Sequence, residues 1–192
     1  MGLCRIHTLV CLLISFVAGC STPDDRLTPI VEPGSQSIKN LNLQPFIAEY
    51  RNLDRDGNEI GTITTQLNVP GGANTDPIEW LCTIETGRGT VVDSIAFDRR
   101  TFAPVYRSFP HSKKGYHYLN IDDGTVTGRI DPPLGQSQPL SIQLDRSFFE
   151  VSLLDFALAA LPLEPGYKVR FPYGDYNQKA IAWAVAEVDG RK

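Results

Sequence analysis

Hydrophobic and polar residues alternate with a period of two along most of the chain after residue 44. Near the start of this region, Phe46 and Tyr50 would face one way and the intervening Glu49 the other, as on a half-buried strand. Turn signals separate such runs at intervals of roughly 8–12 residues. The pattern predicts an antiparallel meander, with strands within 46–51, 63–69, 78–84, 91–97, 102–109, 116–121, 125–130, 140–144, 167–173 and 180–188.

One segment departs from this alternation and predicts a helix that ends before Pro162. Ser147 and Glu150 have the spacing of a capping box, in which the two side chains bind amides of the first helical turn. Because the helix is so apolar, it should lie against the sheet. The fold class is therefore all-β, mainly antiparallel: a curved open sheet or incomplete barrel with one apolar helix packed on it. The helical residues expected to be buried are Phe149, Leu153 and Phe156.

The pairing of the last strand, 180–188, is left open by the sequence. Ile181, Trp183 and Val185 form one face of this strand, and alanines form the other. A hairpin turn is predicted at 189–190, yet the sequence stops at Lys192. We expect a poorly paired edge that invites another strand; the alternative is that earlier strands pair it on both sides.

The N-terminus has the features of a removable signal. Arg5 precedes an apolar stretch at 8–18, which is too short for a membrane span of about 20 residues. This stretch leads into 17–20, Val-Ala-Gly-Cys, which resembles the lipobox of bacterial lipoproteins. The resemblance implies a lipid on the sulfur of Cys20 and a place in the bacterial cell envelope. The residue after this cysteine is Ser21 and not an aspartate, and by the same resemblance this implies the outer membrane, with the protein facing the periplasm.

Three segments follow: a lipoprotein signal peptide at 1–19, a lipid-anchored flexible tether at 20–43 and a single β-rich domain at 44–192. The tether contains three prolines among polar residues and shows no hydrophobic period, which is typical of a linker. The first expected partner is therefore the membrane, through the lipid anchor on Cys20.

Composition and charge fit this picture and argue against one class of partner. The 192 residues are 42% hydrophobic and 21% charged, as in ordinary globular proteins. The net charge of −4 argues against nucleic acid, whose binding proteins usually carry a basic face. With the signal removed and Cys20 lipidated, Cys82 is the one thiol left, so no intrachain disulfide can form.

The usual catalytic and metal-binding signatures are missing, and we expect no enzyme activity, cofactor or metal. G-x-S-x-G, H-E-x-x-H and C-x-x-C motifs do not occur in the sequence. His111 and His117 have no further histidine or cysteine nearby in the sequence. The run that begins at Asp54 has Glu59 at its sixth position and Thr65 at its twelfth, where a calcium loop needs glycine and glutamate, so a hairpin turn is favoured.

The densest charged cluster is Asp93 with Asp98, Arg99 and Arg100. It falls between two predicted strands, which favours a turn held by aspartate–arginine pairs. The alternative is a site for an anionic headgroup, because arginine can bind phosphate or carboxylate with two parallel hydrogen bonds.

Two stretches resemble a known family: 93–105, with Asp-Arg-Arg-Thr-Phe at its centre, and 149–167, which ends in Pro-Gly-Tyr. They are similar to an uncharacterised family of exported bacterial β-proteins, a domain of unknown function, over residues 45–192. That family is distantly similar to the cup-shaped open sheets of periplasmic lipoprotein carriers. The resemblance implies a curved sheet, carries over no catalytic residue, and implies further strands beyond this C-terminus.

Three hypotheses of function remain. A binding module would hold an acyl chain or other apolar ligand in the cup. An accessory protein of an envelope complex would use an open sheet edge. A hydrolase is the least favoured, because no nucleophile–base pair is visible. The aromatic residues either line the cup or, as is favoured, fill the core. The candidate ligand-binding residues are Tyr50, Trp80, Phe97, Arg99, Arg100, Tyr118, Phe171 and Trp183.

Overall fold

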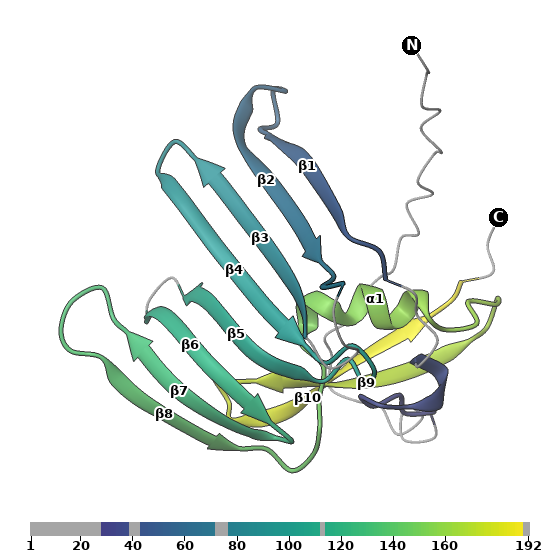
Figure 1. Cartoon of the computed structure of the whole chain (residues 1–192). Helices are drawn as coiled ribbons and strands as arrows, with labels where there is room; N and C mark the ends of the chain where they lie inside the picture. Colours follow the sequence, from purple (N-terminus) through teal and green to yellow (C-terminus); the bar gives the residue numbers. More distant parts are fainter. Residues whose placement is uncertain (1–27, 39–42, 72–76, 112–113, 190–192) are drawn as a thin grey trace.

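The computed structural model describes residues 28–38, 43–71, 77–111 and 114–189. Eight strands form one open antiparallel sheet in chain order, so the predicted meander is confirmed (Figure 1). Two further strands form a separate hairpin. The sheet contains β1 Phe46–Leu53, β2 Glu59–Asn68, β3 Ile78–Thr86, β4 Gly89–Phe97, β5 Pro104–His111, β6 Gly115–Asp122, β7 Thr125–Asp131 and β8 Gln138–Gln143, and the hairpin contains β9 Lys168–Asp175 and β10 Ala180–Glu187.

The sheet divides into two wings where β4 meets β5. These strands pair only between Ser94 and Phe97 of β4, whereas β3 pairs with β4 along its whole length. Beyond Ser94 they separate, and Figure 1 shows β1–β4 rising away from β5–β8. The Tyr116 hydroxyl on β6 spans this split by donating a hydrogen bond to the carbonyl of Val92. We call the halves the β1–β4 wing and the β5–β8 wing.

Strand register assigns one face of both wings to the hollow side of the curved sheet. Leu67 lies opposite Trp80, and Trp80 lies opposite Ile95. Ile95 lies opposite Arg107, and Arg107 lies opposite Leu119. Because directly opposed residues of neighbouring strands share a face, this row runs across both wings. An arginine therefore stands among apolar residues on the hollow side.

Two hydrophobic cores fill the hollow side. The first joins β2, β3 and β4 to the helical segment and the β9–β10 hairpin, and the second joins β6, β7 and β8 to the hairpin turn. The chain passes from one core to the other between Phe148 and Phe149, both of which are fully buried. Phe149 meets Phe171 edge-on in the first core, at 5.8 Å between ring centres. The two wings are thus stabilised by different partners.

The predicted apolar helix is present but is shorter than the sequence pattern indicates. It consists of a 3-10 turn, Val151–Leu153, followed by α1, Leu154–Ala159. Phe149 and Leu153 are fully buried, as expected. Phe156 is half-buried, and its ring lies 6.5 Å from an aromatic ring of β1 and from another of β4. The helix therefore covers the end of the β1–β4 wing that adjoins the first core.

The predicted capping box is wrong. The Ser147 hydroxyl donates to the carboxylate of Asp123 at 2.7 Å. Glu150 precedes the 3-10 turn, but its side chain makes no capping hydrogen bond. It binds Arg107 and Tyr176 instead. Partners distant in sequence occupy both side chains, so the helical segment begins only at Val151–Leu153.

The β9–β10 hairpin has one bridged edge and one open edge. Isolated bridges join Ile30 and Phe149 to β9. In the part of the chain that the structure describes, β10 pairs with β9 alone, so it does not lie in the middle of a sheet. Ala184 and Ala186 are buried in the first core, whereas Trp183 on the larger-residue face is half-exposed.

Residues 28–38 belong to the fold, although the sequence places them in a flexible tether. The amide of Val31 donates to the carbonyl of Arg170 at 3.0 Å, and the amide of Gly34 donates to Thr101 at 2.7 Å. Val31 and Ile38 are buried in the first core. Two isolated apolar residues in a proline-rich stretch thus anchor a segment that lacks any hydrophobic period.

The expected signal peptide and Cys20 lie outside the residues that the structure describes, as do 21–27 of the tether. Among the described residues, no helix has the length and hydrophobicity needed to cross a membrane.

Candidate functional site

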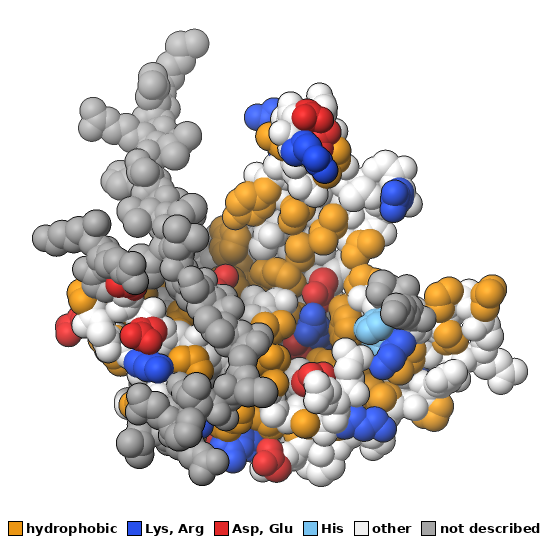
Figure 2. All heavy atoms as spheres, turned by 180° about the vertical axis from the view of Figure 1, so that it is seen from behind, with side chains coloured by type: hydrophobic (Ala, Val, Ile, Leu, Met, Phe, Trp, Pro, Cys, Tyr) orange, Lys and Arg blue, Asp and Glu red, His pale blue; other side chains and the backbone are white. Residues whose placement is uncertain are grey.

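Polar and aromatic side chains meet in the hollow where the two wings part. Arg107 and Phe109 on β5 and His117 on β6 belong to the hollow face. The β9–β10 turn contributes Tyr176, and the segment before the 3-10 turn contributes Glu150. Figure 2 looks onto this side and shows basic, acidic and histidine side chains in the middle of the hollow, below hydrophobic side chains of the β1–β4 wing.

Arg107 stands at the centre of an ionic group that we call the Arg107 cluster: Arg107, Asp93, Glu150 and Tyr176. Its Nη2 lies 3.0 Å from Oδ2 of Asp93, and its Nη1 donates to Oε2 of Glu150. The Tyr176 hydroxyl donates to the other Glu150 oxygen. The side chains of Glu150 and Arg107 are only 1% and 11% exposed. Water therefore screens this pairing little.

Burial and pairing set the charges of the Arg107 cluster. Burial raises the pKa of Glu150, while Arg107 and the Tyr176 hydroxyl act in the opposite direction by stabilising the carboxylate. Burial disfavours the charge of Arg107, yet Glu150 and Asp93 raise its pKa, so the guanidinium stays charged. Burial and Glu150 raise the pKa of Tyr176. A hydroxyl that is so firmly protonated is a poor nucleophile, so the cluster is suited to joining elements.

A histidine pair lies beside the Arg107 cluster. The His117 ring stacks on Phe109 with 4.7 Å between ring centres, and the His111 ring lies 5.6 Å away. His117 is only 4% exposed. Burial lowers the pKa of His117, and the neighbouring His111 and Lys114 lower it further by electrostatic interaction. The imidazole of His117 is therefore neutral at neutral pH.

Two cavities open around this histidine, with volumes of about 480 and 190 Å³. His117, Tyr176 and Asn177 line both of them. The other residues that line the larger cavity are Lys114, Ile130, Pro132, Gln138, Pro139, Leu140 and Lys179. The other residues that line the smaller cavity are Arg107, Phe109, His111, Val151, Tyr173, Gly174 and Asp175. No cluster of three or more metal-binding side chains occurs among the residues that the structure describes.

A row of apolar side chains remains uncovered near the tip of the β1–β4 wing. Tyr50, Ile63, Ile84 and Val91 lie opposite one another across the four strands, and we call them the wing row. Tyr50 is 56% exposed and Val91 39% exposed, while the two isoleucines are half-buried.

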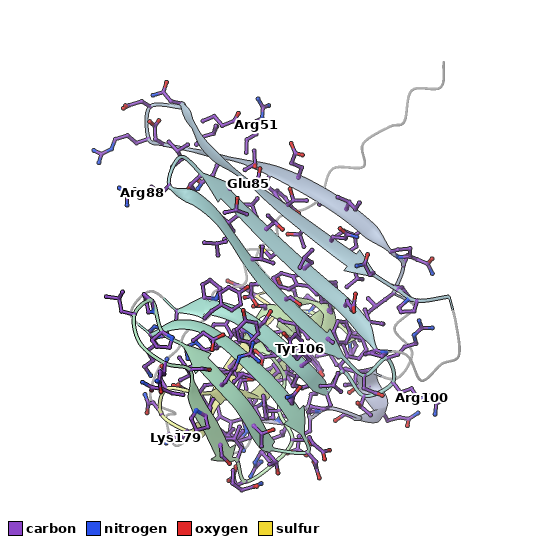
Figure 3. The ribbon with its side chains drawn as sticks, turned by 60° about the vertical axis from the view of Figure 1, so that its left-hand side comes forward. Arg51, Glu85, Arg88, Arg100, Tyr106 and Lys179 are labelled. Atoms are coloured by element: carbon purple, nitrogen blue, oxygen red, sulfur yellow. The ribbon has the colours of Figure 1, made fainter. Side chains whose placement is uncertain are left out.

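The next row on the convex face is polar instead. It consists of Arg51, Thr62, Glu85 and Thr90, and Figure 3 labels two of its members near the tip. The hollow face of this wing thus carries an apolar row even where the helix does not reach, although the row between it and the core includes Thr65 and Asp93.

The structure places the eight sequence-predicted ligand residues in different surroundings. Phe97 and Phe171 are fully buried in the first core, and Trp80 packs against that core. Tyr50 belongs to the wing row. Tyr118 lies on the convex face, since it adjoins the inward-facing Leu119, and its ring lies 4.1 Å from the guanidinium of Arg129. These five aromatic residues therefore do not line one cup.

The other three predicted residues are also dispersed. Arg99 and Arg100 lie in the turn after β4, where the Arg99 side chain donates to the carbonyl of Pro70. In Figure 3, Arg100 lies at the opposite end of the strands from Arg88. Trp183 lines a groove of about 360 Å³ between the end of β8 and the start of β10, with the guanidinium of Arg170 4.6 Å from its ring.

Both predicted turns are confirmed, but the contacts of the β4–β5 turn differ from those expected. Oδ1 of Asp54 accepts the amides of Asp56 and Asn58 at 2.9 Å in the β1–β2 hairpin. Oδ1 of Asp98 accepts the amide and the hydroxyl of Thr101, each at 2.8 Å. Backbone amides and a threonine thus hold the β4–β5 turn in place of the expected aspartate–arginine pairs.

Sequence reasoning missed Arg107 and Tyr176 and misassigned Glu150. The available signal was the position of Arg107, whose cross-strand neighbours Ile95 and Leu119 are both apolar and fully buried. That signal requires the strand register. Glu150 is 43 residues away in the sequence, so only the folded chain brings the pair together.

The model of one protein family matches residues 47–192; its description is "Protein of unknown function (DUF3108)". The match covers the sheet from the second residue of β1 onward, the helical segment and the β9–β10 hairpin. No curated protein and no solved structure matches the chain.

Proposed function

The chain belongs to the DUF3108 family of proteins of unknown function, and we propose that it is a non-catalytic, lipid-anchored binding module of the bacterial cell envelope. Its ligand carries an apolar chain, which lies along the hollow face of the β1–β4 wing. The observation that carries this proposal is the wing row. Four apolar side chains stand partly exposed in register, next to a fully polar row on the other face of the same strands.

Exposed apolar rows of this kind are characteristic of binding surfaces. Single apolar residues scattered over a surface are normal and need no explanation. A row that continues the first core outward along the hollow face is not scattered and needs one. Trp80 and Cys82 connect the row to the core along β3, since both alternate with outward-facing residues of that strand. An acyl chain laid along this face would bury apolar surface, and each Å² removed from water contributes about 25 cal/mol of favourable free energy.

A matched pair of variants tests the proposal, because the chain contains only two tryptophans and they face different surroundings. Trp80 lies on the hollow face, whereas Trp183 lies beside Arg170 on the outer face of the hairpin. Stearate carrying a nitroxide on its chain should quench the fluorescence of Trp183→Phe, which keeps Trp80. It should leave Trp80→Phe largely unquenched. Equal quenching of the two variants, or none in either, would refute binding along the hollow face.

The envelope location rests on the lipobox resemblance and has its own test. Cys20→Ser removes the sulfur that would carry the lipid, so the protein should leave the membrane fraction. Fractionation with the membrane in both forms, together with an N-terminal peptide that carries no lipid mass, would refute the anchor.

A second candidate function, an accessory protein of an envelope complex, is favoured by the open edge of β10. This strand is rich in alanine and has no proline or lysine to discourage pairing. In the isolated chain, every second amide of β10 should exchange faster than the amides of β3, which pairs on both sides. Uniform protection of β10 as strong as that of β3 would rule out this edge as a docking site.

A further inference from the structure

A separate feature of the molecule is the pair of adjacent cavities between the β5–β8 wing and the β9–β10 turn. The larger, of about 480 Å³, falls in the size range of small-molecule sites, and the smaller, of about 190 Å³, adjoins it. Ile130, Pro132 and Leu140 give the larger cavity an apolar wall. This wall belongs to β7, β8 and the connection between them, away from the wing row. The cavities are therefore a second site, independent of the proposed function.

The charge of the larger cavity is positive. Lys114 and Lys179 line it, and no carboxylate is among the described residues on its wall. The Nζ of Lys114 donates to Oδ1 of Asn177 at 3.0 Å, which holds that ammonium group against the turn. Figure 3 shows Lys179 at the outer margin of the β5–β8 wing. The two lysines would attract an anion rather than a cation.

The wall of the smaller cavity contains the charged guanidinium of Arg107 and one carboxylate, which belongs to Asp175. Its Oδ1 accepts the amides of Asn177 and Gln178 at 3.0 and 3.1 Å. This carboxylate therefore serves to hold the β9–β10 turn in place.

The wall shared by the cavities contains a buried nitrogen without a partner. His117 is 4% exposed, and its Nδ1 makes no hydrogen bond. A neutral imidazole has one nitrogen that donates and one that accepts. Leaving a buried polar atom unpaired costs about 1–3 kcal/mol, which a polar atom of a ligand would offset.

We propose that these cavities, which we call the His117 site, bind a small organic carboxylate. Its hydrocarbon body lies against the wall of Ile130, Pro132 and Leu140. Its carboxylate lies between Lys114 and Lys179, and one oxygen accepts a hydrogen bond from Nδ1 of His117, which must then be the nitrogen that carries a proton. Lysine suits this role because it acts as a point charge and needs no planar geometry in its partner.

Titration of the purified full chain with hexanoate, hexanol and inorganic phosphate tests separately whether the ligand needs its charge and its apolar body. Hexanoate should move the ring signals of His117 in nuclear magnetic resonance spectra, with saturation. Hexanol, which lacks the charge, and phosphate, which lacks the apolar body, should each bind at least about tenfold more weakly. Equal binding of hexanol and hexanoate, or of phosphate and hexanoate, would overturn the assignment.

Variants locate the binding. Lys114→Gln combined with Lys179→Gln should raise the dissociation constant for hexanoate about tenfold or more. Lys168→Gln is the matched control, since Lys168 pairs with Glu187 and lines neither cavity. His117→Phe should preserve the stack on Phe109 and weaken binding. Should that variant fail to fold, the lysine variants still decide: unchanged affinity in the double variant would refute the site.

Discussion

The two wings have the same meander and the same alternation, but they are covered differently. The helical segment covers the inner end of the hollow face of the β1–β4 wing and leaves the tip bare. The hairpin turn covers the hollow face of the β5–β8 wing, where Leu119, Val126 and Ile142 are buried. Burial therefore depends on which element lies above a strand, and alternation alone does not determine it. The wing left partly bare supports the proposed function.

The boundary between the wings is also the most polar part of the interior. The first core lies on one side of it and the second on the other, and the Arg107 cluster lies between them. Backbone pairing between β4 and β5 is short at this point, so side chains take over part of the linkage. Arg107 pairs with Asp93 of β4 and with Glu150 of the segment that leads into the helix, and it thereby joins these two elements.

Removing this linkage should have the largest effect on stability. Arg107→Met leaves Glu150 and Asp93 without their cationic partner, and breaking a buried pair in this way costs about 3–5 kcal/mol. Urea unfolding monitored by circular dichroism measures the loss. A loss of less than about 1 kcal/mol would show that the two wings do not depend on the cluster.

Arg129→Met is the matched control. The Arg107 guanidinium lies over the Phe109 ring at 4.4 Å, and that of Arg129 likewise lies over the Tyr118 ring at 4.1 Å. Arg129 also pairs with an aspartate, but its side chain is 55% exposed. Because exposed pairs contribute little, this variant should lose about 1 kcal/mol or less. The difference between the two arginine variants isolates the effect of burial.

The cover of the β1–β4 wing gives the second prediction. Leu153 is fully buried, so Leu153→Ala should lower the free energy of unfolding by about 2–5 kcal/mol. Val151, two residues earlier in the same 3-10 turn, is 50% exposed, and Val151→Ala should cost about 0.5 kcal/mol or less. Similar losses for the two variants would mean that the helical segment does not lie against the sheet as described.

A direct comparison of the wings gives the third prediction. Ile121 and Ile84 both belong to the hollow face, but Ile121 is 6% exposed in the second core and Ile84 is half-buried in the wing row. Ile121→Ala should cost about 2–4 kcal/mol, and Ile84→Ala about 1 kcal/mol. Ile84→Ala should also weaken quenching of Trp80 by nitroxide stearate, which Ile121→Ala should leave unchanged. An equal loss of quenching would place the ligand elsewhere.

The sequence predicts the strands well because solvent and core lie on opposite faces of each strand, which is what period-two alternation records. It predicts the helix less well, because Ser147 and Glu150 have two possible sets of partners. The local partners are visible in the sequence, whereas Asp123 and Arg107 become available only when the sheet has formed. Where local and tertiary partners compete for a side chain, spacing alone cannot decide.

The same limit applies to the candidate site. The sequence separates the two faces of β10 but does not say which one is buried. Ala184 and Ala186 are buried in the first core, and Ala184 pairs with the bulky, fully buried Phe171. Small residues opposite large ones let layers pack closely. The residues of the His117 site come from the five strands β5 to β9, the connections after β5, β7 and β9, and the 3-10 turn, so their meeting required the fold. Their residue types alone gave no signal.

The smallest predicted effect concerns the β4–β5 turn, the covalent link between the wings. Burial would raise the pKa of Asp98, but hydrogen bonds from the Thr101 side chain and from turn amides outweigh it and lower that pKa below 3.8. An acid with a lowered folded pKa stabilises the fold above its unfolded pKa, and this contribution is lost as the pH falls through the folded value.

Thr101→Val removes the hydrogen bond from the Thr101 hydroxyl to Asp98 and should cost about 1 kcal/mol at pH 7, since the turn is partly exposed. The difference from the unmodified chain should shrink as the pH falls through the lowered folded pKa of Asp98, because the carboxyl is then protonated in both chains. Thr127→Val, at an exposed position of β7, should show neither effect. The Thr101 hydroxyl also accepts the amide of Ala103 at 3.2 Å, a bond that does not depend on the Asp98 charge. A loss in Thr101→Val that stays constant from pH 7 to the acid limit would show that this bond or packing, and not the Asp98 carboxylate, holds the turn.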